Sequence, residues 1–229
     1  MKAFVSILFI FVFQLSVISQ ECMSSEYLKK GTQWEVSNFD KKGKLSSTTK
    51  YDVLNASHSG GKSSWEIKVA VFDKKDEALN EGATEIICEN GIYKMDMGQM
   101  IPSETMQSIQ SMEVEMEGTT INFPTSKDVN TKLEDAEITI TAATSGMIIM
   151  NMKLTITERK IEGLESITTE AGTFECLKIT EKSQIENKMF NRTYTTVSWF
   201  LPGFGVVRSE SYDHKDKLMG SSELSAITR

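Results

Sequence analysis

The sequence predicts a single all-β domain, formed by one strongly curved antiparallel sheet or an open β-barrel with one short helix. Three observations support this prediction. Apolar and polar residues alternate along many successive runs, as in strands that bury one face. Short turns that resemble one another separate several of these runs, and such turns join antiparallel neighbours. No linker or change in composition divides the 229 residues into two domains.

The first twenty residues are predicted to be a secretory signal peptide and are not counted in the fold. Lys2 precedes an apolar run, residues 4–13, that is short for a membrane span. Cleavage is expected near Gln20, which leaves residues 21–229 as one domain in the periplasm or outside the cell. A retained anchor is one alternative. A lipoprotein acylated on Cys22 is another, although Glu21 stands where such a signal needs a small residue.

The three cysteines are interpreted in the light of this predicted export. An oxidising compartment allows one disulfide and leaves one thiol. We predict a Cys22–Cys88 disulfide that fixes the start of the mature chain. Cys176 stands in an alternating run and is expected to be a small buried apolar residue. The cysteine spacing is not that of a structural zinc site, and no metal or cofactor is predicted.

Seven alternating runs are predicted to be strands, and β-branched residues are frequent in them. The longest contains a break in the alternation at Glu158, Arg159 and Lys160. The predicted strands are residues 34–39, 64–71, 138–141, 147–161, 173–185, 193–200 and 206–212.

Three turns share one pattern, at residues 39–45, 72–78 and 212–218. In each, an aromatic residue ends a strand, and the next residue is an Asp whose side chain can bond the turn. A Gly or a second Asp then stands where the chain needs a positive φ angle. These turns are therefore interpreted as hairpin connections and not as phosphate-binding loops.

A methionine-rich segment interrupts the β pattern. Pro102 and Ser103 suit a helix start, and the sequence predicts a short helix over residues 103–111, lying on a sheet face or across a barrel opening. A long loop is predicted for residues 124–137. The 13 methionines of the chain allow three interpretations: core filling, Cu(I) binding, or an adaptable cavity for a lipid. The residues expected to border such a cavity are Met100, Met106, Ile109 and Met112.

Other chemistry is not supported by the residue pattern. His58 and His214 both stand in turn-like stretches without a metal-ligand or triad partner nearby in the sequence. The net charge of −7 does not favour nucleic acid, whose phosphates need a clustered basic surface. We therefore expect a protein without enzymatic activity, probed most directly by whether two buried carboxylates share one cleft.

Three motifs carry a resemblance to a known family. They are Gly31-Thr32-Gln33-Trp34-Glu35, the stretch Thr168–Ile179 (TTEAGTFECLKI) and the stretch Trp199–Glu210 (WFLPGFGVVRSE). With them the mature chain resembles the TapB-like proteins of the Bacteroidetes, which are related to a wider bacterial exported domain of unknown function. Glu170 departs from the proline that this family has in its turn. The resemblance implies a barrel-like or strongly curved sheet exported across the inner membrane, and it implies no catalytic residue.

Two hypotheses follow for the function. The first is a non-enzymatic envelope protein that binds an apolar ligand or lipid on a concave face beside the methionine-rich helix. The second is a structural or assembly protein that acts through a surface for an envelope protein partner. A cavity favours the first hypothesis, and a filled interior with an exposed apolar patch favours the second. A monomer is expected in both cases.

Overall fold

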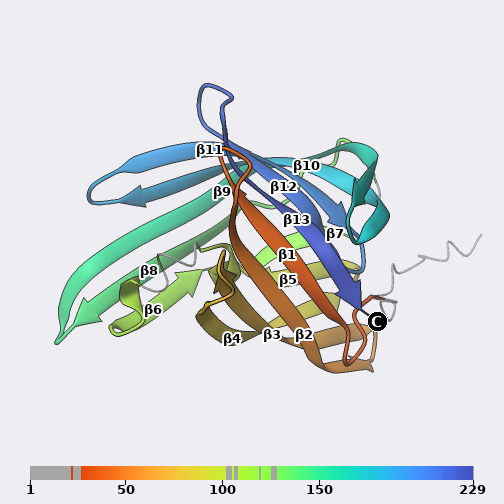
Figure 1. Ribbon diagram of the computed structural model, residues 1–229, viewed down its shortest axis with the longest axis horizontal. Coiled ribbons are helices and arrows are strands. Elements are labelled where there is room, and N and C mark those ends of the chain that lie inside the picture. The colour runs from red at the N-terminus through yellow and green to blue at the C-terminus, as the bar shows by residue number, and fades with distance from the viewer. Residues whose placement is uncertain are drawn as a thin grey trace, which may run out of the picture.

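The protein forms one antiparallel sheet of 13 strands that curls into an almost closed barrel (Figure 1). This computed structural model describes residues 22, 27–101, 105, 108–118, 120–124 and 128–228. The predicted all-β fold is confirmed, and the predicted signal peptide lies outside the described residues. In the described part of the chain, no helix has the length and apolar character needed to cross a membrane.

The strands are joined largely by short hairpins, so most neighbours in sequence are neighbours in the sheet. Their bounds are β1 Gln33–Asp40, β2 Leu45–Ser59, β3 Lys62–Asp73, β4 Ala78–Glu89, β5 Ile92–Asp96, β6 Glu113–Gly118, β7 Thr120–Pro124, β8 Ala136–Thr144, β9 Met147–Thr169, β10 Gly172–Asn187, β11 Asn191–Leu201, β12 Gly205–Tyr212 and β13 Leu218–Thr228. The seven predicted strands all lie within these elements. The predicted loop 124–137 matches the connection between β7 and β8 to within two residues.

The two edge strands of the sheet, β6 and β7, come from one continuous stretch of chain. The strand order is β6-β8-β9-β10-β11-β12-β13-β1-β2-β3-β4-β5-β7, so the two edge strands are consecutive in sequence. β6 pairs with β8, whereas β7 pairs with β5. At Gly118 the backbones approach closely, because a Cβ atom added there would lie 2.4 Å from the carbonyl oxygen of Glu137. The sheet therefore curls round until its ends meet at residues 113–124.

Aromatic side chains fill the interior between opposite walls. The rings of Trp65 on β3 and Tyr93 on β5 are stacked 5.9 Å apart, and Tyr93 meets Phe200 of β11 edge-on at 6.3 Å. Phe200 also stacks on Phe123 of β7 at 4.5 Å. All four side chains are buried. This row ties the β3–β5–β7 wall to β11 and forms part of a continuous hydrophobic core.

The three predicted turns have the same geometry. In each, the Oδ1 atom of the Asp accepts hydrogen bonds from the backbone amides two and four residues later, at 2.8–3.0 Å. These amides lower the pKa of Asp40, Asp73 and Asp213. The expected positive φ occurs at Gly43 (71°) and at its counterparts Asp76 (62°) and Asp216 (55°). The hairpin interpretation of the repeated pattern is confirmed.

The segment predicted to be helical is helical at its described residues Thr105, Ser108 and Ile109 and follows a 3-10 turn. Met97–Met100 form a 3-10 turn, where the side chain of Asp96 accepts a hydrogen bond from the amide of Gly98 at 2.7 Å. Within the predicted range 103–111, Thr105, Ser108 and Ile109 are helical, and residues 103–104 and 106–107 lie outside the described part. The main difference from the sequence prediction is that the first turn forms earlier, at Met97.

Candidate functional site

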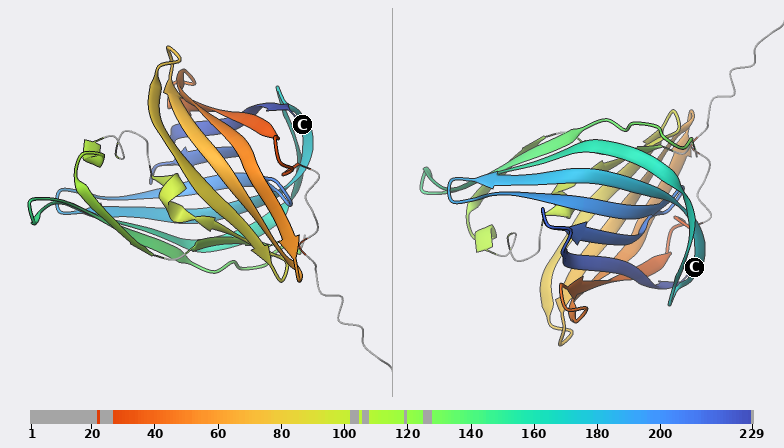
Figure 2. Two further views of the ribbon diagram at one scale, coloured as in Figure 1. Left: turned by 90° about the horizontal axis from the view of Figure 1, so that it is seen from below. Right: turned by 90° about the horizontal axis from the view of Figure 1, so that it is seen from above.

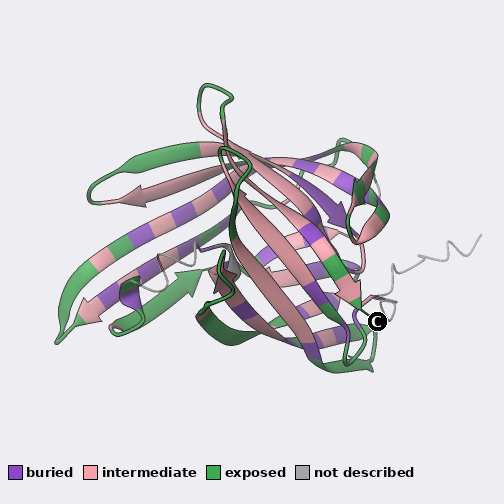
Figure 3. Cartoon of the chain, in the orientation of Figure 1, coloured by how far each residue is buried: buried purple, intermediate pink, exposed green. Residues whose placement is uncertain are grey.

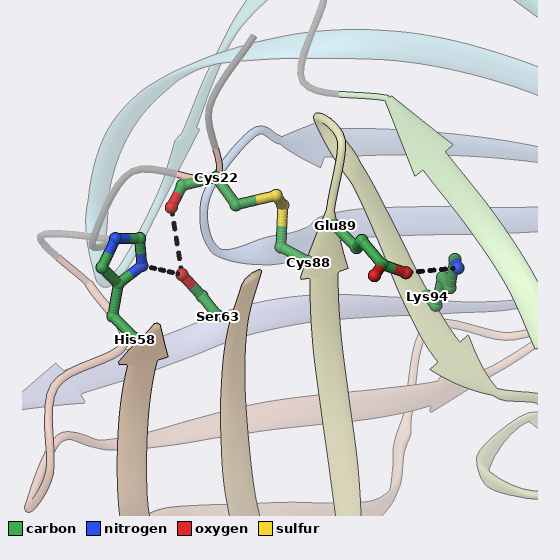
Figure 4. Close-up of a disulfide and its surroundings, with 6 residues drawn as sticks. All are labelled: Cys22, His58, Ser63, Cys88, Glu89 and Lys94. Atoms are coloured by element: carbon green, nitrogen blue, oxygen red, sulfur yellow. Dashed lines mark hydrogen bonds and ion pairs between the residues drawn. A yellow bond between two sulfur atoms is a disulfide. The ribbon is translucent and has the colours of Figure 1, made fainter. Parts of the chain in front are cut away.

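A disulfide fixes the N-terminal arm against the sheet (Figure 4). Cys22 is bonded to Cys88, which lies near the end of β4, with the Cα atoms 5.6 Å apart. This is the pairing expected from the sequence. The buried hydroxyl of Ser63 donates a hydrogen bond to the carbonyl oxygen of Cys22 at 3.0 Å. Since that hydroxyl has one hydrogen, the 2.8 Å contact with His58 requires the imidazole Nδ1–H to be the donor.

A pocket of about 330 Å³ lies beside this arm. Leu28 of the arm and Trp65 of β3 are buried in its lining, and Ala56 of β2 is opposite Trp65 in the ladder. Its volume is at the lower end of the range for small-molecule sites, roughly 300–1,000 Å³. The pocket therefore offers an apolar floor to a small ligand, and the arm that forms one side is held by the disulfide.

The edge of the pocket carries two lysines and a histidine. Lys29, Lys30 and His58 all line it, and all three are exposed. An apolar floor with two ammonium groups at the edge suits a ligand that has an apolar body and an acidic head. His58 was expected in a turn, but it lies in β2, where its pairing with Ser63 of β3 places it at the pocket.

Of the four residues predicted to border a cavity, the side chains of Ile109 and Met112 are described, and they do not line this pocket. Ile109 is buried in the hydrophobic core, and Met112 packs against the core while partly exposed. Met106 lies outside the described residues, and the side chain of Met100 is likewise not described. Met97, which was not among the residues predicted to border a cavity, is fully buried. Met97, Ile109 and Met112 thus pack into or against the core, as the core-filling interpretation expects, whereas Met116 is 40% exposed, and none of these four lines the pocket beside the disulfide.

Sequence reasoning missed a buried ion pair. The side chains of Arg159 on β9 and Glu181 on β10 are 0% and 3% exposed, and their Nε and Oε2 atoms are 3.1 Å apart. The Nη1 atom of Arg159 also donates to the carbonyl oxygens of Asn122 and Glu134, at 3.0 and 2.9 Å. Burial raises the pKa of Glu181, although Arg159 opposes this effect. Arg159 therefore joins β9 to β7 and to the segment before β8, where the barrel closes.

A bulge turns this arginine inward. The even-numbered residues Met152, Leu154 and Ile156 of β9 are buried, whereas the odd-numbered Arg159 and Ile161 are buried after the register shift opposite Glu181. Glu158 has a φ of 53° at this point. The interruption at residues 158–160 noted in the sequence was the available signal. If the alternation is followed separately on each side of this interruption, the residues after it place Arg159 on the buried face.

Clustered metal ligands and buried acidic side chains are sparse among the described residues. No group of three or more His, Cys, Asp or Glu residues in this part of the chain could hold a metal ion. Glu181 is the only acidic side chain buried among the described residues, so no second buried carboxylate shares its environment there. Cys176 is a free, buried thiol, and burial raises its pKa to about 12. A thiol in this state is a poor nucleophile.

The comparison with protein families gives the chain its classification. The DUF3108-like family matches residues 29–224, which is most of the chain. The chain belongs to the DUF3108-like family. The narrower TapB-like assignment stays a prediction. No curated protein matches the sequence.

Two solved structures share the fold of this DUF3108-like chain. One is a Bacteroides fragilis protein inferred to be exported, with a YmcC-like fold; it is 22% identical, with a TM-score of 0.79, over 91% of this chain and 100% of that one. The other is an inferred lipoprotein from Parabacteroides distasonis, 24% identical with a TM-score of 0.76, over 88% of this chain and 96% of that one. At these identities the similarity establishes the fold.

Proposed function

We propose that this DUF3108-like protein is an envelope protein that binds a small amphiphilic ligand without catalysing a reaction. The pocket beside the disulfide is the observation that carries the proposal, because it combines a buried apolar floor with exposed lysines at its edge. The apolar body of the ligand would contact Leu28 and Trp65. Its acidic head would lie near Lys29 and Lys30. The proposal thus keeps the predicted apolar ligand but moves its site away from the methionine-rich segment.

Export and location form part of the same proposal. The predicted signal peptide and the exported or lipoprotein character inferred for the two similar proteins support a place in the cell envelope. The Cys22–Cys88 disulfide is consistent with an oxidising compartment. With its sulfur in a disulfide, Cys22 is not available for acylation, so a released protein is favoured over a lipid-anchored one. We further propose that it acts as a monomer and belongs within the TapB-like group.

Calorimetric titration with dodecanoate and with its methyl ester tests the binding proposal. We expect saturable binding of one dodecanoate molecule per chain. The ester should bind more weakly, because it lacks the negative charge that the lysines attract. Replacing Lys29 and Lys30 together by Gln should remove this difference between acid and ester. Native mass spectrometry of protein purified from its own envelope would identify a ligand already bound.

Two matched tryptophan substitutions locate the site. Ala56→Trp fills the pocket and should abolish dodecanoate binding. Ala83→Trp, at an exposed position of β4 outside the pocket lining, should leave binding unchanged. Absence of saturable binding to the parent protein would remove the proposal. Equal affinities in the two variants would show that dodecanoate binds somewhere other than this pocket.

A further inference from the structure

Two hairpins project together from one end of the sheet (Figure 2), and the residues at their tips are exposed (Figure 3). The β8–β9 hairpin exposes Met147, Ile148 and Ile149, whose exposed fractions are 68%, 54% and 55%. The neighbouring β10–β11 hairpin exposes Met189 (88%) and Phe190 (39%). β9 pairs with β10 as far as Met152 and Asn187, so the two tips belong to adjacent strands.

The apolar side chains at the first tip point in more than one direction. Met147 and Ile148 are successive residues of one strand and pair in regular register with Thr144 and Ala143, so they project from opposite faces of the hairpin. Each is more than half exposed, and neither belongs to the core. A protein partner docked on one face would leave the other of these two side chains in water. A surrounding apolar medium would cover both.

Charge at the tips favours a phospholipid surface. Residues 138–152 contain no Asp, Glu, Lys or Arg, and residues 187–193 contain Lys188 and Arg192 without an acid, in a chain of net charge −7. The Arg192 guanidinium lies 5.4 Å from the ring centre of Phe190, so the cation sits directly beside an exposed apolar group. Glu186, the nearest acid on this hairpin, accepts hydrogen bonds from Gln184 and Asn191.

We propose that these two tips insert into the interfacial layer of a phospholipid bilayer, with Lys188 and Arg192 at the lipid phosphates. The run from Met147 to Met150 spans about 10 Å at roughly 3.3 Å per residue. That length matches the depth of about 5–10 Å to which interfacial protein segments enter a membrane. The acidic side chains of the edge strand β6 begin at Glu113, which pairs with Ala143, the partner of Ile148, and therefore lies one residue back from the level of Met147. This inference is independent of the pocket and its ligand.

Flotation with lipid vesicles tests the proposal on the chain purified after export. Vesicles of phosphatidylcholine alone, and with added phosphatidylglycerol, separate the apolar contribution from the ionic one. The parent protein should float with both, and more strongly with the anionic mixture. Replacing Ile148 and Ile149 by Asn should reduce the bound fraction on the order of tenfold on both vesicles. Replacing Lys188 and Arg192 by Gln should remove only the preference for phosphatidylglycerol.

Leu164→Asn is the matched control, because Leu164 is a similarly exposed residue of β9 (46%) far along the strand from the tip. It should float like the parent protein, and circular dichroism should show all variants folded. A parent protein that floats with neither vesicle overturns the proposal. So does a tip variant that floats as well as the parent. A dimer on gel filtration that dissociates in the tip variant would assign the tips to a second copy of this chain instead.

Discussion

Removal of Arg159 is the most informative perturbation of the fold. Arg159→Met keeps an unbranched apolar stem of similar reach but removes three charge-assisted hydrogen bonds, to Glu181 and to the carbonyl oxygens of Asn122 and Glu134. Breaking a buried ion pair by deleting one partner costs about 3–5 kcal/mol. We expect the free energy of unfolding at pH 8 to fall by this amount, measured by urea denaturation followed through tryptophan fluorescence.

The loss of unfolding free energy caused by Arg159→Met should also depend on pH, because Glu181, left without Arg159, can bind a proton. Burial raises the folded-state pKa of Glu181 already in the parent protein. Without the opposing charge of Arg159 it should rise further. A raised folded pKa gives stability that is present below the unfolded value and lost as pH rises through the folded value. Glu181 therefore has one folded-state pKa in the parent protein and a higher one in Arg159→Met. As pH rises from the first value to the second, the free energy of unfolding of the variant should fall relative to that of the parent by about 1.4 kcal/mol per pH unit.

Two further variants separate the contributions. Adding Glu181→Leu to Arg159→Met removes the buried carboxyl, so the pH dependence should disappear and only the cost of the two unbonded carbonyl oxygens should remain. Lys182→Met breaks an exposed ion pair with Glu158 on the same two strands and should cost at most about 1 kcal/mol. The reasoning is refuted if Arg159→Met costs no more than Lys182→Met, or costs the same at pH 5 and pH 8.

Four other predictions concern closure, turns and cysteines. Gly118→Ala should destabilise the fold several times more than Gly82→Ala, as measured by thermal denaturation of the two variants. A Cβ atom added at residue 118 meets backbone atoms, whereas one added at residue 82 meets nothing within 4 Å. In the same assay, Gly43→Ala should lower the free energy of unfolding by about 1 kcal/mol, because residue 43 has a left-handed φ angle. Gly43→Asn should lower it less, because Asn adopts this conformation more readily. Cys22→Ser should lower the free energy of unfolding in urea by up to about 4 kcal/mol, the chain-entropy value for a separation of 66 residues. The Cys176 thiol should react with a maleimide only in denaturant, because it is buried and burial raises its pKa to about 12.

The sequence contains enough information for the class of fold and for its local turns. Alternation reports which residues share a face, and an Asp followed by a residue of positive φ is a local signal that needs no tertiary contact. Strands whose side chains are exposed on both faces were harder to predict. β6 is exposed along its whole length, and the end of β2 is exposed beyond Val53, so neither shows a buried face whose periodicity could be detected.

The pocket could not be predicted because its parts meet only in three dimensions. Leu28 comes from the N-terminal arm, and Trp65 comes from β3, and the Cys22–Cys88 disulfide holds the arm in place. The buried ion pair poses the same problem, since Arg159 and Glu181 are 22 residues apart. The methionine-rich segment shows the converse. Its composition drew attention to Ile109, yet an unusual density of flexible apolar side chains is also what a core needs.

A charged side chain, Arg159, is buried in the core where the barrel closes. The segment 113–124 pairs with β8 through its first half and with β5 through its second. Arg159 bonds the carbonyl oxygens of Asn122 on the edge strand β7 and of Glu134 in the segment before β8. A buried carbonyl left unbonded costs about 1–3 kcal/mol, and an arginine can bond two at once. Its charge then requires Glu181, and the bulge at Glu158 is what brings Arg159 inward. The interruption of the β9 alternation therefore places Arg159 where the two ends of the sheet come together.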